Sequence, residues 1–260
     1  MRTWLAAVIA AVIAAVLVFT DSTASGDTEV GPLPSDTDVD YQLGGAVAAP
    51  GHVGIVVRDR HAQPQAGRFN ICYVNGFQTQ ASQKRFWKKR AGLLLRDRRG
   101  RLVVDAAWGE WLLDLRSGQK RKRLARIVTR WTAGCAADGF DAVEFDNLDS
   151  FTRSRGLLKR KHARKFARLL TRGAHRAGLV AGQKNLAGFD GHQVGYDFVV
   201  AEECGRYQEC GDYVDDFADQ VLMIEYRRKD FAATCAGFGA THAVVLRDRD
   251  LSANGVRTWC

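Results

Sequence analysis

The stretch DGFDAVEFDNLDSF, residues 138–151, sets five carboxylates among apolar residues. Its central part, AVEFDN, favours a β-strand, in which alternate side chains share a face. Glu144 and Asp146 therefore lie on the same face as Ala142, and the other face is apolar until Asn147. Burying carboxylates is costly unless neighbouring groups compensate for the loss of water. We therefore expect a buried strand whose carboxyl end has a chemical function.

The N-terminus predicts export. One positive charge precedes an apolar run over residues 4–19, which is short for a membrane span of about 20 residues. Small residues follow at 22–25, so we interpret residues 1–25 as a signal peptide, with an uncleaved membrane anchor as the alternative. Either interpretation places the rest outside the cytoplasm. Residues 26–40 have a linker composition, and 41–260 are long enough for one compact domain.

Six cysteines in an exported chain indicate disulfides. Cys204 and Cys210 are near enough in sequence to close a small loop. Cys260 could attach the C-terminus to Cys235, which leaves the pair Cys72–Cys135 by elimination. The spacings match no zinc motif, so we expect neither a metal nor another cofactor.

Apolar runs alternate with basic segments of helical period from residue 41 onward. The helices are expected at 120–137 and 157–177, and the eight strands at 41–45, 68–75, 101–106, 141–147, 179–185, 197–203, 220–226 and 242–248. This alternation predicts a parallel sheet with outer helices, and eight strands predict a compact α/β fold, the (β/α)8 TIM barrel. An open doubly wound sheet is the second possibility, although no G-x-G-x-x-G follows the first strand.

Polar residues close most of these strand candidates, where the active site of such a barrel lies. The predicted site residues at or near strand ends are Tyr73, Asn75, Trp108, Glu144, Asp146, Lys184, Glu202, Glu225 and Tyr226. Two carboxylates across a pocket can hydrolyse a glycosidic bond, one as acid and one as nucleophile or base. Aromatic side chains could hold sugar rings. A metal-dependent hydrolase could use the same acids, so composition leaves that alternative open.

The ordered motifs resemble glycoside hydrolase family 114, the endo-α-1,4-polygalactosaminidase-like TIM barrels. The resemblance covers about residues 41–260 and rests on YQLGG (41–45), ICYVN (71–75), WGEWLLD (108–114), FDAVEFDN (140–147), KN (184–185), AEEC (201–204) and IEY (224–226). It implies cleavage of α-1,4-linked galactosamine polymers. Asp146 would be the nucleophile and Glu202 the acid/base. Ala201 and Glu203 depart from the asparagine and glutamine usual in the family, which puts activity in more doubt than fold.

The remaining site residues are expected to bind substrate, and the chain is expected to act as a secreted monomer on an amino-sugar polysaccharide. Basic residues cover the two predicted helices, which we interpret as a solvated shell, with binding to an anionic polymer or nucleic acid as the alternative. A formal charge of +9 would repel a cationic substrate at long range. The second functional hypothesis is a non-catalytic carbohydrate- or polyanion-binding barrel with a degraded site. No obligatory nucleic acid is expected.

Overall fold

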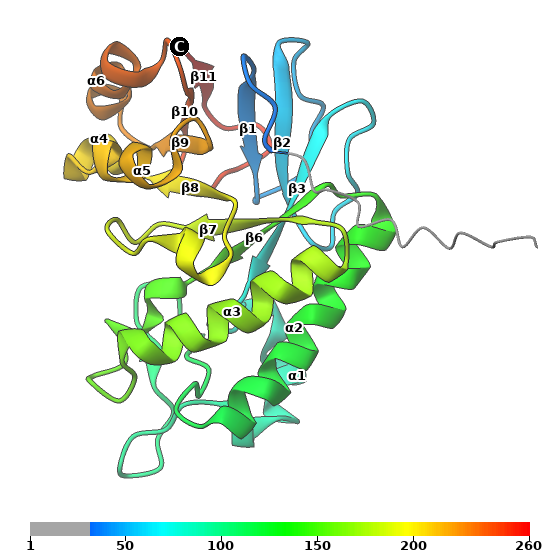
Figure 1. The fold of residues 1–260 in the computed structure, drawn as a ribbon, viewed down its shortest axis with the longest axis vertical. Coiled ribbons are helices and arrows are strands. Elements are labelled where there is room, and N and C mark those ends of the chain that lie inside the picture. Colours follow the sequence, from blue (N-terminus) through cyan, green and yellow to red (C-terminus); the bar gives the residue numbers. More distant parts are fainter. Residues whose placement is uncertain (1–31) are drawn as a thin grey trace, which may run out of the picture.

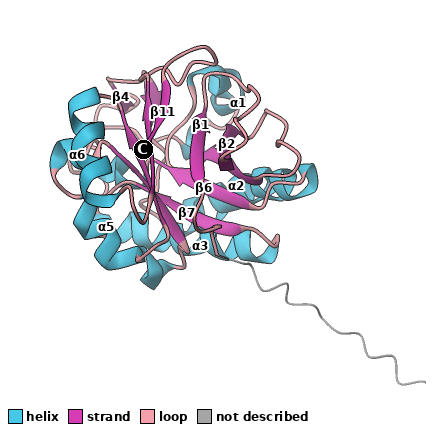
Figure 2. Cartoon of the chain, turned by 90° about the horizontal axis from the view of Figure 1, so that it is seen from above, coloured by secondary structure: helices cyan, strands magenta, loops and turns pink. Residues whose placement is uncertain are grey.

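The computed structural model describes residues 32–260, so the predicted signal peptide lies outside the described residues. Eight parallel strands form one sheet that curves into a barrel (Figures 1 and 2). They are β1 (Asp38–Gln42), β2 (Val53–Asp59), β3 (Phe69–Asn75), β6 (Ala142–Asp146), β7 (Val180–Lys184), β8 (Phe198–Glu202), β9 (Val221–Glu225) and β10 (Ala243–Arg247). The sheet order follows the chain order, which confirms the predicted barrel topology.

Two of the predicted strands need correction. The segment 101–106 does not join the barrel, because β4 (Val104–Asp105) pairs antiparallel with β5 (Glu110–Trp111) in a separate ribbon. The missing barrel strand is β2, which follows β1 through a loop without a helix. The first strand also begins at Asp38, before the predicted range of 41–45.

The sheet is nearly closed. A ninth strand, β11 (Arg257–Trp259), pairs antiparallel with β10. Side chains bridge the seam between β10, β11 and β1. Arg247 Nη1 lies 3.3 Å from Asp40 Oδ1, and Trp259 Nε1 donates to the carbonyl of Val39 at 2.8 Å. The C-terminus therefore completes the wall beside the first strand.

The barrel interior and the helix shell form separate cores. The inner core consists mainly of Val39, Tyr41, Ile55, Val57, Ile71, Tyr73, Ala142, Val180, Phe198, Val200, Leu222, Ile224 and Val245. Gly182 on β7 gives the Phe198 ring room, because a Cβ there would lie 2.3 Å from the ring. Strand alternation fixes which side chains reach this interior, and those at the carboxyl ends form the site described below.

The two helices predicted by residue range lie at nearly their observed positions. Ser117 caps α2 (Gly118–Asp138), which ends at Gly139 with φ of 93°, and α3 (Arg160–Arg176) lies alongside it (Figure 1). The other helices are α1 (Lys84–Lys88), α4 (Cys204–Tyr207), α5 (Cys210–Phe217) and α6 (Arg228–Phe238), with short 3-10 turns η1 (Ala81–Gln83), η2 (Ala91–Leu93), η3 (Leu148–Phe151) and η4 (Gly191–Val194). Over residues 32–260 no helix has the length and apolar character that crossing a membrane requires.

The three predicted disulfides are confirmed. Cys204 bonds to Cys210, and Cys235 bonds to the C-terminal Cys260. Cys72 on β3 bonds to Cys135 on α2, which ties the longest of the described helices to the barrel wall. All six cysteines are used.

Candidate active site

The acidic strand β6 turns both of its carboxylates inward. Ala142 packs in the inner core, and Glu144 and Asp146 follow on the same face by strand alternation. The intervening Val143 and Phe145 belong to the outer core, beneath the helices. The alternation in residues 142–147 therefore predicts correctly that Glu144 and Asp146 share a face.

Glu144 lies beneath the site and is fully buried. Tyr41 donates its hydroxyl to Glu144 Oε1 at 2.7 Å, and Lys184 Nζ donates to the same oxygen at 2.9 Å. Burial raises the pKa of Glu144 to about 7, although Lys184 opposes the rise. Glu144 does not line the cleft, which corrects the prediction that it contacts substrate. It holds Lys184 in place instead.

Lys184 connects the carboxylates of the site. Its ammonium is buried, lies 2.9 Å from Glu144 and is 3.3 Å from Glu202 Oε2. Burial would lower the pKa of Lys184, but Glu144, Glu202 and Asp146 outweigh it and raise the pKa well above its ordinary value. The side chain is therefore a permanent positive charge below the cleft.

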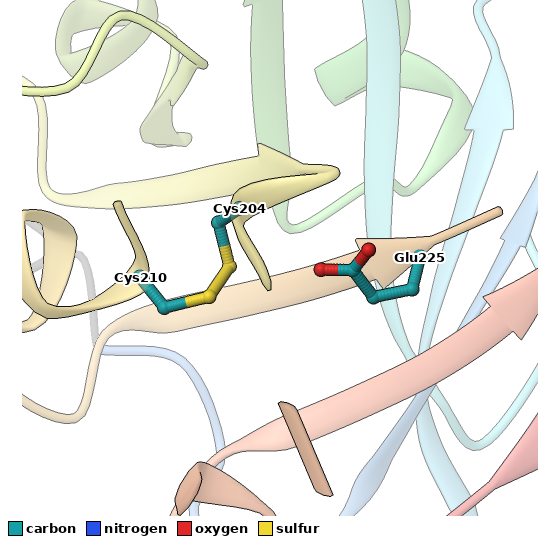
Figure 3. Close-up of side chains that lie close together, drawn as sticks. All are labelled: Cys204, Cys210 and Glu225. Carbon is teal, nitrogen blue, oxygen red and sulfur yellow. A yellow bond between two sulfur atoms is a disulfide. The ribbon is translucent and has the colours of Figure 1, made fainter. Parts of the chain in front are cut away.

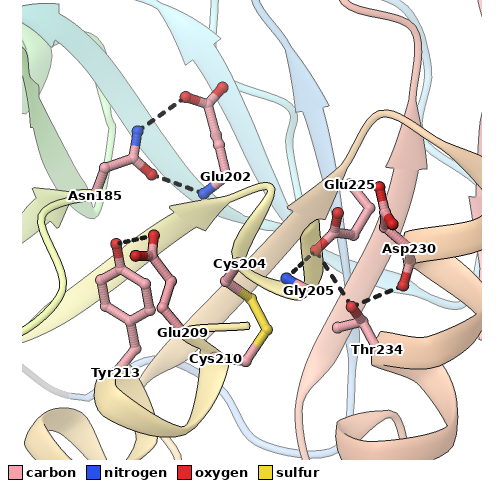
Figure 4. Close-up of a disulfide and its surroundings, with 10 residues drawn as sticks. All are labelled: Asn185, Glu202, Cys204, Gly205, Glu209, Cys210, Tyr213, Glu225, Asp230 and Thr234. Carbon is pink, nitrogen blue, oxygen red and sulfur yellow. Dashed lines mark hydrogen bonds between the residues drawn. A yellow bond between two sulfur atoms is a disulfide. The ribbon is translucent and has the colours of Figure 1, made fainter. Parts of the chain in front are cut away.

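Glu202 projects from the carboxyl end of β8. Tyr226 donates its hydroxyl to Oε1, and Asn185 Nδ2 donates to Oε2 at 3.1 Å. Asn185 also accepts the backbone N–H of Glu202 at 2.7 Å, which fixes the strand end (Figure 4). Burial alone would raise the pKa of Glu202, but Lys184, Tyr226 and Asn185 together hold it below its ordinary value of 4.5.

Asp146 has fewer donors than Glu202. Tyr73 donates its hydroxyl to Oδ2 at 2.7 Å, and the backbone N–H of Asn147 donates to Oδ1 at 2.6 Å. Burial raises the pKa of Asp146 above 3.8. Lys184 works against this rise, and the charge of Glu202 adds to it. In the free cleft Asp146 is therefore shifted towards protonation, and Glu202 away from it.

A cleft of about 520 Å³ opens over these groups. Its lining residues include Leu43, Tyr73, Asp105, Trp108, Glu110, Asp146, Asn147, Asp149, Arg153, Lys184, Asn185, Glu202, Glu203, Tyr226, Arg249 and Asp250. Seven of them are carboxylic acids and three are cations, so acids prevail here although the whole chain is positive. The cleft is suited to a polar or cationic ligand.

The β4–β5 ribbon and the loop between its strands supply one wall of the cleft. Trp108 is 61% exposed there, which leaves its ring available to a sugar. Glu110 accepts a hydrogen bond from Asn75 at 2.9 Å, and burial raises the pKa of Glu110 to about 7. Asn75 thus lies behind Glu110 rather than in the lining, which makes it a supporting residue.

The two departures from the family pattern have different positions. Ala201 faces the outer core, so the missing amide does not change the cleft. Glu203 lines the cleft and has φ of 56°. Its carboxylate pairs with Arg206 at 2.6 Å and with Arg249 at 2.9 Å. The additional carboxylate is therefore neutralised by arginines from two segments.

Glu225 faces away from the cleft, which corrects its prediction as a substrate-binding residue. It accepts the N–H of Gly205 at 2.7 Å and the hydroxyl of Thr234 at 3.2 Å, on the outer side of β9 (Figure 4). The disulfide Cys204–Cys210 lies beside it (Figure 3). Both sulfurs are oxidised, so this cluster has no thiolate to bind a metal. Glu225 stabilises the turn after Glu202.

Several cleft residues were missed by the pattern of strand ends. Arg153 and Arg249 lie in loops, Asp149 lies in the 3-10 turn η3, and Asp105 ends a strand of the separate ribbon. Arg153 Nε pairs with Asp105 Oδ2 at 2.7 Å, which joins the ribbon to the loop after β6. By contrast, Asn147, Asn185 and Glu203 are each the last residue of a predicted barrel strand, so the pattern of strand ends could have supplied them.

The family model for glycoside hydrolase family GH114 matches residues 20–260. The chain belongs to glycoside hydrolase family 114. It is therefore a glycosidase, and the cleft at the carboxyl ends of the GH114 barrel strands is its candidate active site.

Solved structures share this GH114 chain's fold. A crystal structure of Aspergillus fumigatus Ega3 in complex with galactosamine has 22% sequence identity and a TM-score of 0.71, over 87% of this chain and 96% of that one. The glycoside hydrolase domain of PelA from Pseudomonas aeruginosa has 16% identity and a TM-score of 0.57, over 86% and 98%. An α-galactosidase from Thermus thermophilus has 13% identity and a TM-score of 0.51, over 82% and 58%. A search of curated proteins found no significant match.

Proposed function

We propose that the protein is a secreted, monomeric, retaining endo-glycosidase that cleaves a galactosamine-containing polysaccharide. The observation that carries this proposal is the convergence of Asp146 and Glu202 on one predominantly acidic cleft. A polymer of free galactosamine carries ammonium groups, which this cleft would attract. The structure of Ega3 with galactosamine supports the same substrate class. The three disulfides fit an oxidising, extracytoplasmic location.

In the proposed first step, Glu202 donates its proton to the glycosidic oxygen while Asp146 attacks the anomeric carbon. The bond to the leaving sugar breaks and an ester to Asp146 forms. In the second step Glu202 removes a proton from water, which attacks the anomeric carbon and releases Asp146. Tyr73 supports Asp146 by a hydrogen bond, and the charge of Lys184 favours the ionised form of Asp146 against the effect of burial.

The pKa shifts in the free cleft oppose the protonation states that the mechanism requires. The mechanism needs Glu202 protonated and Asp146 ionised, whereas their pKa values are lowered and raised, respectively. The dependence of kcat/KM on pH follows the ionisations of the free enzyme. We therefore expect a narrow optimum at acidic pH, where the product of the two required populations is greatest.

The test is release of reducing ends from partially deacetylated galactosaminogalactan. Wild-type protein should generate them, and Asp146→Asn and Glu202→Gln should each lose most of the activity. Glu203→Gln is a matched control, because it changes the neighbouring carboxylate without touching the proposed pair. Activity retained by both site variants would contradict the proposed roles.

Azide separates the roles of the two carboxylates. Azide should rescue Glu202→Ala with retained anomeric configuration, since the glycosyl ester of Asp146 still forms. It should rescue Asp146→Ala with inverted configuration, because azide then replaces the carboxylate as nucleophile. A non-catalytic barrel would instead bind the polymer and release no reducing ends in any form, wild type included.

A further inference from the structure

Two helices carry a concentrated part of the positive charge of the chain. Together α2 and α3 carry thirteen Lys and Arg residues and one carboxylate, Asp138, which gives them a formal charge of +12. The rest of the chain has a formal charge of −3, since the total is +9. The two helices pack side by side on one flank of the barrel (Figure 1). An ordinary solvated shell would mix charges of both signs.

A groove of about 500 Å³ runs along these helices. Its lining is Lys122, Ala125, Arg126, Thr129, Arg130 and Ala133 from α2, with Leu169 and Arg176 from α3. The helices approach closely here, because a Cβ on Gly173 would lie 2.7 Å from Thr129 Oγ1. The groove therefore has a floor of small residues and walls of cationic side chains.

A second depression continues the groove on the other side of α2. It measures about 200 Å³ and includes Arg90, Arg123 and the same Arg126 and Arg130. Arg126 and Arg130 are separated by about 6 Å along the helix axis, one turn apart. They stand between both hollows and are exposed.

The guanidinium groups of Arg126 and Arg130 are available to a ligand. Among the residues that the structure describes, neither side chain takes part in an ion pair or a side-chain hydrogen bond. Other basic residues of α2 are engaged: Lys120 pairs with Asp114 at 2.6 Å, and Arg121 donates to the carbonyl of Leu115 at 2.6 Å. Unpaired guanidinium forks are suited to binding phosphate oxygens in pairs.

The lining decides which polyanion fits. It contains no aromatic ring to stack on bases or sugars and only one neutral polar side chain, Thr129. The large apolar side chains exposed in the described chain are Trp108, Tyr207 and Val256, and none lies on these helices, so nothing here would insert into a membrane. A rigid duplex would touch only the groove walls, whereas a flexible single chain can lie along the floor.

We propose that this groove binds a flexible, linear phosphodiester polymer without bases. The polymer's phosphates pair with Arg126, Arg130 and the flanking cations, while its backbone lies over the small residues of the floor. No residue of this groove lines the active-site cleft. The protein therefore binds an anionic polymer on its flank while the cleft stays free for a substrate of opposite charge.

The test measures binding of a fluorescent glycerol-phosphate oligomer by anisotropy over a range of salt concentrations. Wild-type protein should bind it with an affinity that falls steeply as salt rises. Arg126→Ala/Arg130→Ala should weaken binding about thirtyfold. Each cation near an anionic partner increases the affinity roughly fivefold, and the variant removes two of them. Arg126→Lys/Arg130→Lys should recover part of the loss, because charge returns without the guanidinium fork.

Arg228→Ala/Lys229→Ala is the matched control, because it removes two exposed cations from α6, on the other side of the molecule in Figure 1. This control should change the affinity for the oligomer less than about threefold, because charges far from the groove are largely screened by salt. Thermal unfolding of each variant checks that it is folded. If both double alanine variants lost affinity equally, net charge alone would explain the effect, and the proposal would be overturned. Absence of oligomer binding, or tighter binding of duplex DNA or anionic phospholipid vesicles, would overturn it as well.

Discussion

Replacing Lys184 with methionine tests the electrostatic design of the site. The substitution removes the buried positive charge while keeping most of the apolar stem. A unit charge 3.3 Å away is worth about 5 kcal/mol at an effective dielectric constant of 20 and about 1.3 kcal/mol at 80. The side chain of Glu202 is 24% exposed, which places it between these limits. Its pKa should therefore rise by about one to three units.

The pKa of Asp146 should rise in the same variant, because Lys184 lowers it as well. Glu202 then stays protonated to higher pH, and Asp146 ionises only at higher pH. Both limbs of the kcat/KM profile should move in the alkaline direction, and the optimum should move with them. The assay is release of reducing ends from partially deacetylated galactosaminogalactan, with initial rates measured from about one unit below to three units above the wild-type optimum.

Two controls separate charge from packing. Lys184→Arg keeps a positive charge and should leave the optimum within about one unit. Tyr41→Phe removes the hydroxyl that donates to Glu144 but keeps the charge of Lys184, so its profile should also stay in place. A profile of Lys184→Met that keeps the wild-type optimum, or moves towards acid, would refute the account of how this ammonium controls Glu202.

Three further substitutions test separate parts of the structure. Tyr73→Phe removes a hydrogen bond to Asp146 and should lower kcat/KM about tenfold or more, with an unchanged melting temperature; a loss below twofold would refute its supporting role. Glu110 has a folded pKa of about 7 against an ordinary 4.5, so its neutral form stabilises the fold fully below pH 4.5 and this contribution is lost as pH rises through 7. Glu110→Gln should therefore match the wild type in urea unfolding at pH 4 and exceed it by up to about 3 kcal/mol at pH 8, and equal stability at pH 8 would contradict this. Gly182→Ala should cost about 1–3 kcal/mol of unfolding free energy, because its methyl group meets the Phe198 ring, and an unchanged urea midpoint would show that the ring moves aside at little cost.

The sequence predicts the barrel well where strands alternate with amphipathic helices. This holds from β6 to β10, where each predicted strand is found close to its expected range. The prediction fails between residues 43 and 68, because the loops there carry no helix and the strand–helix rhythm is absent. It fails again at 101–106, where an apolar run of the right length packs in a ribbon instead of the barrel wall. The spacing of apolar residues predicts that a segment is a strand, but it does not predict which other strand that segment pairs with.

Strand alternation also explains which site residues the sequence could supply. Tyr226 closes the run IEY on the inner face, with Ile224 in the inner core, so the adjacent Glu225 has to point outward. The sequence thus contained the information that excludes Glu225 from the cleft. It did not contain the position of Arg249 or Arg153, because loops bring these residues to the cleft without any period.

The distribution of charge resolves the conflict between a basic chain and the cationic substrate that we propose. Salt screens charges from one another beyond about 8 Å at physiological ionic strength. A bound substrate therefore responds mainly to the charges near it and only weakly to the net charge of the whole molecule. A substrate at the cleft lies within that range of seven acids and three cations, whereas the excess of positive charge is on α2 and α3, whose residues do not line the cleft. Raising the salt concentration should therefore weaken two attractions that are independent of each other, one at each surface. Because the cleft and the groove share no residue, removing Arg126 and Arg130 should change polyanion binding while leaving the KM for an amino-sugar polymer nearly unchanged.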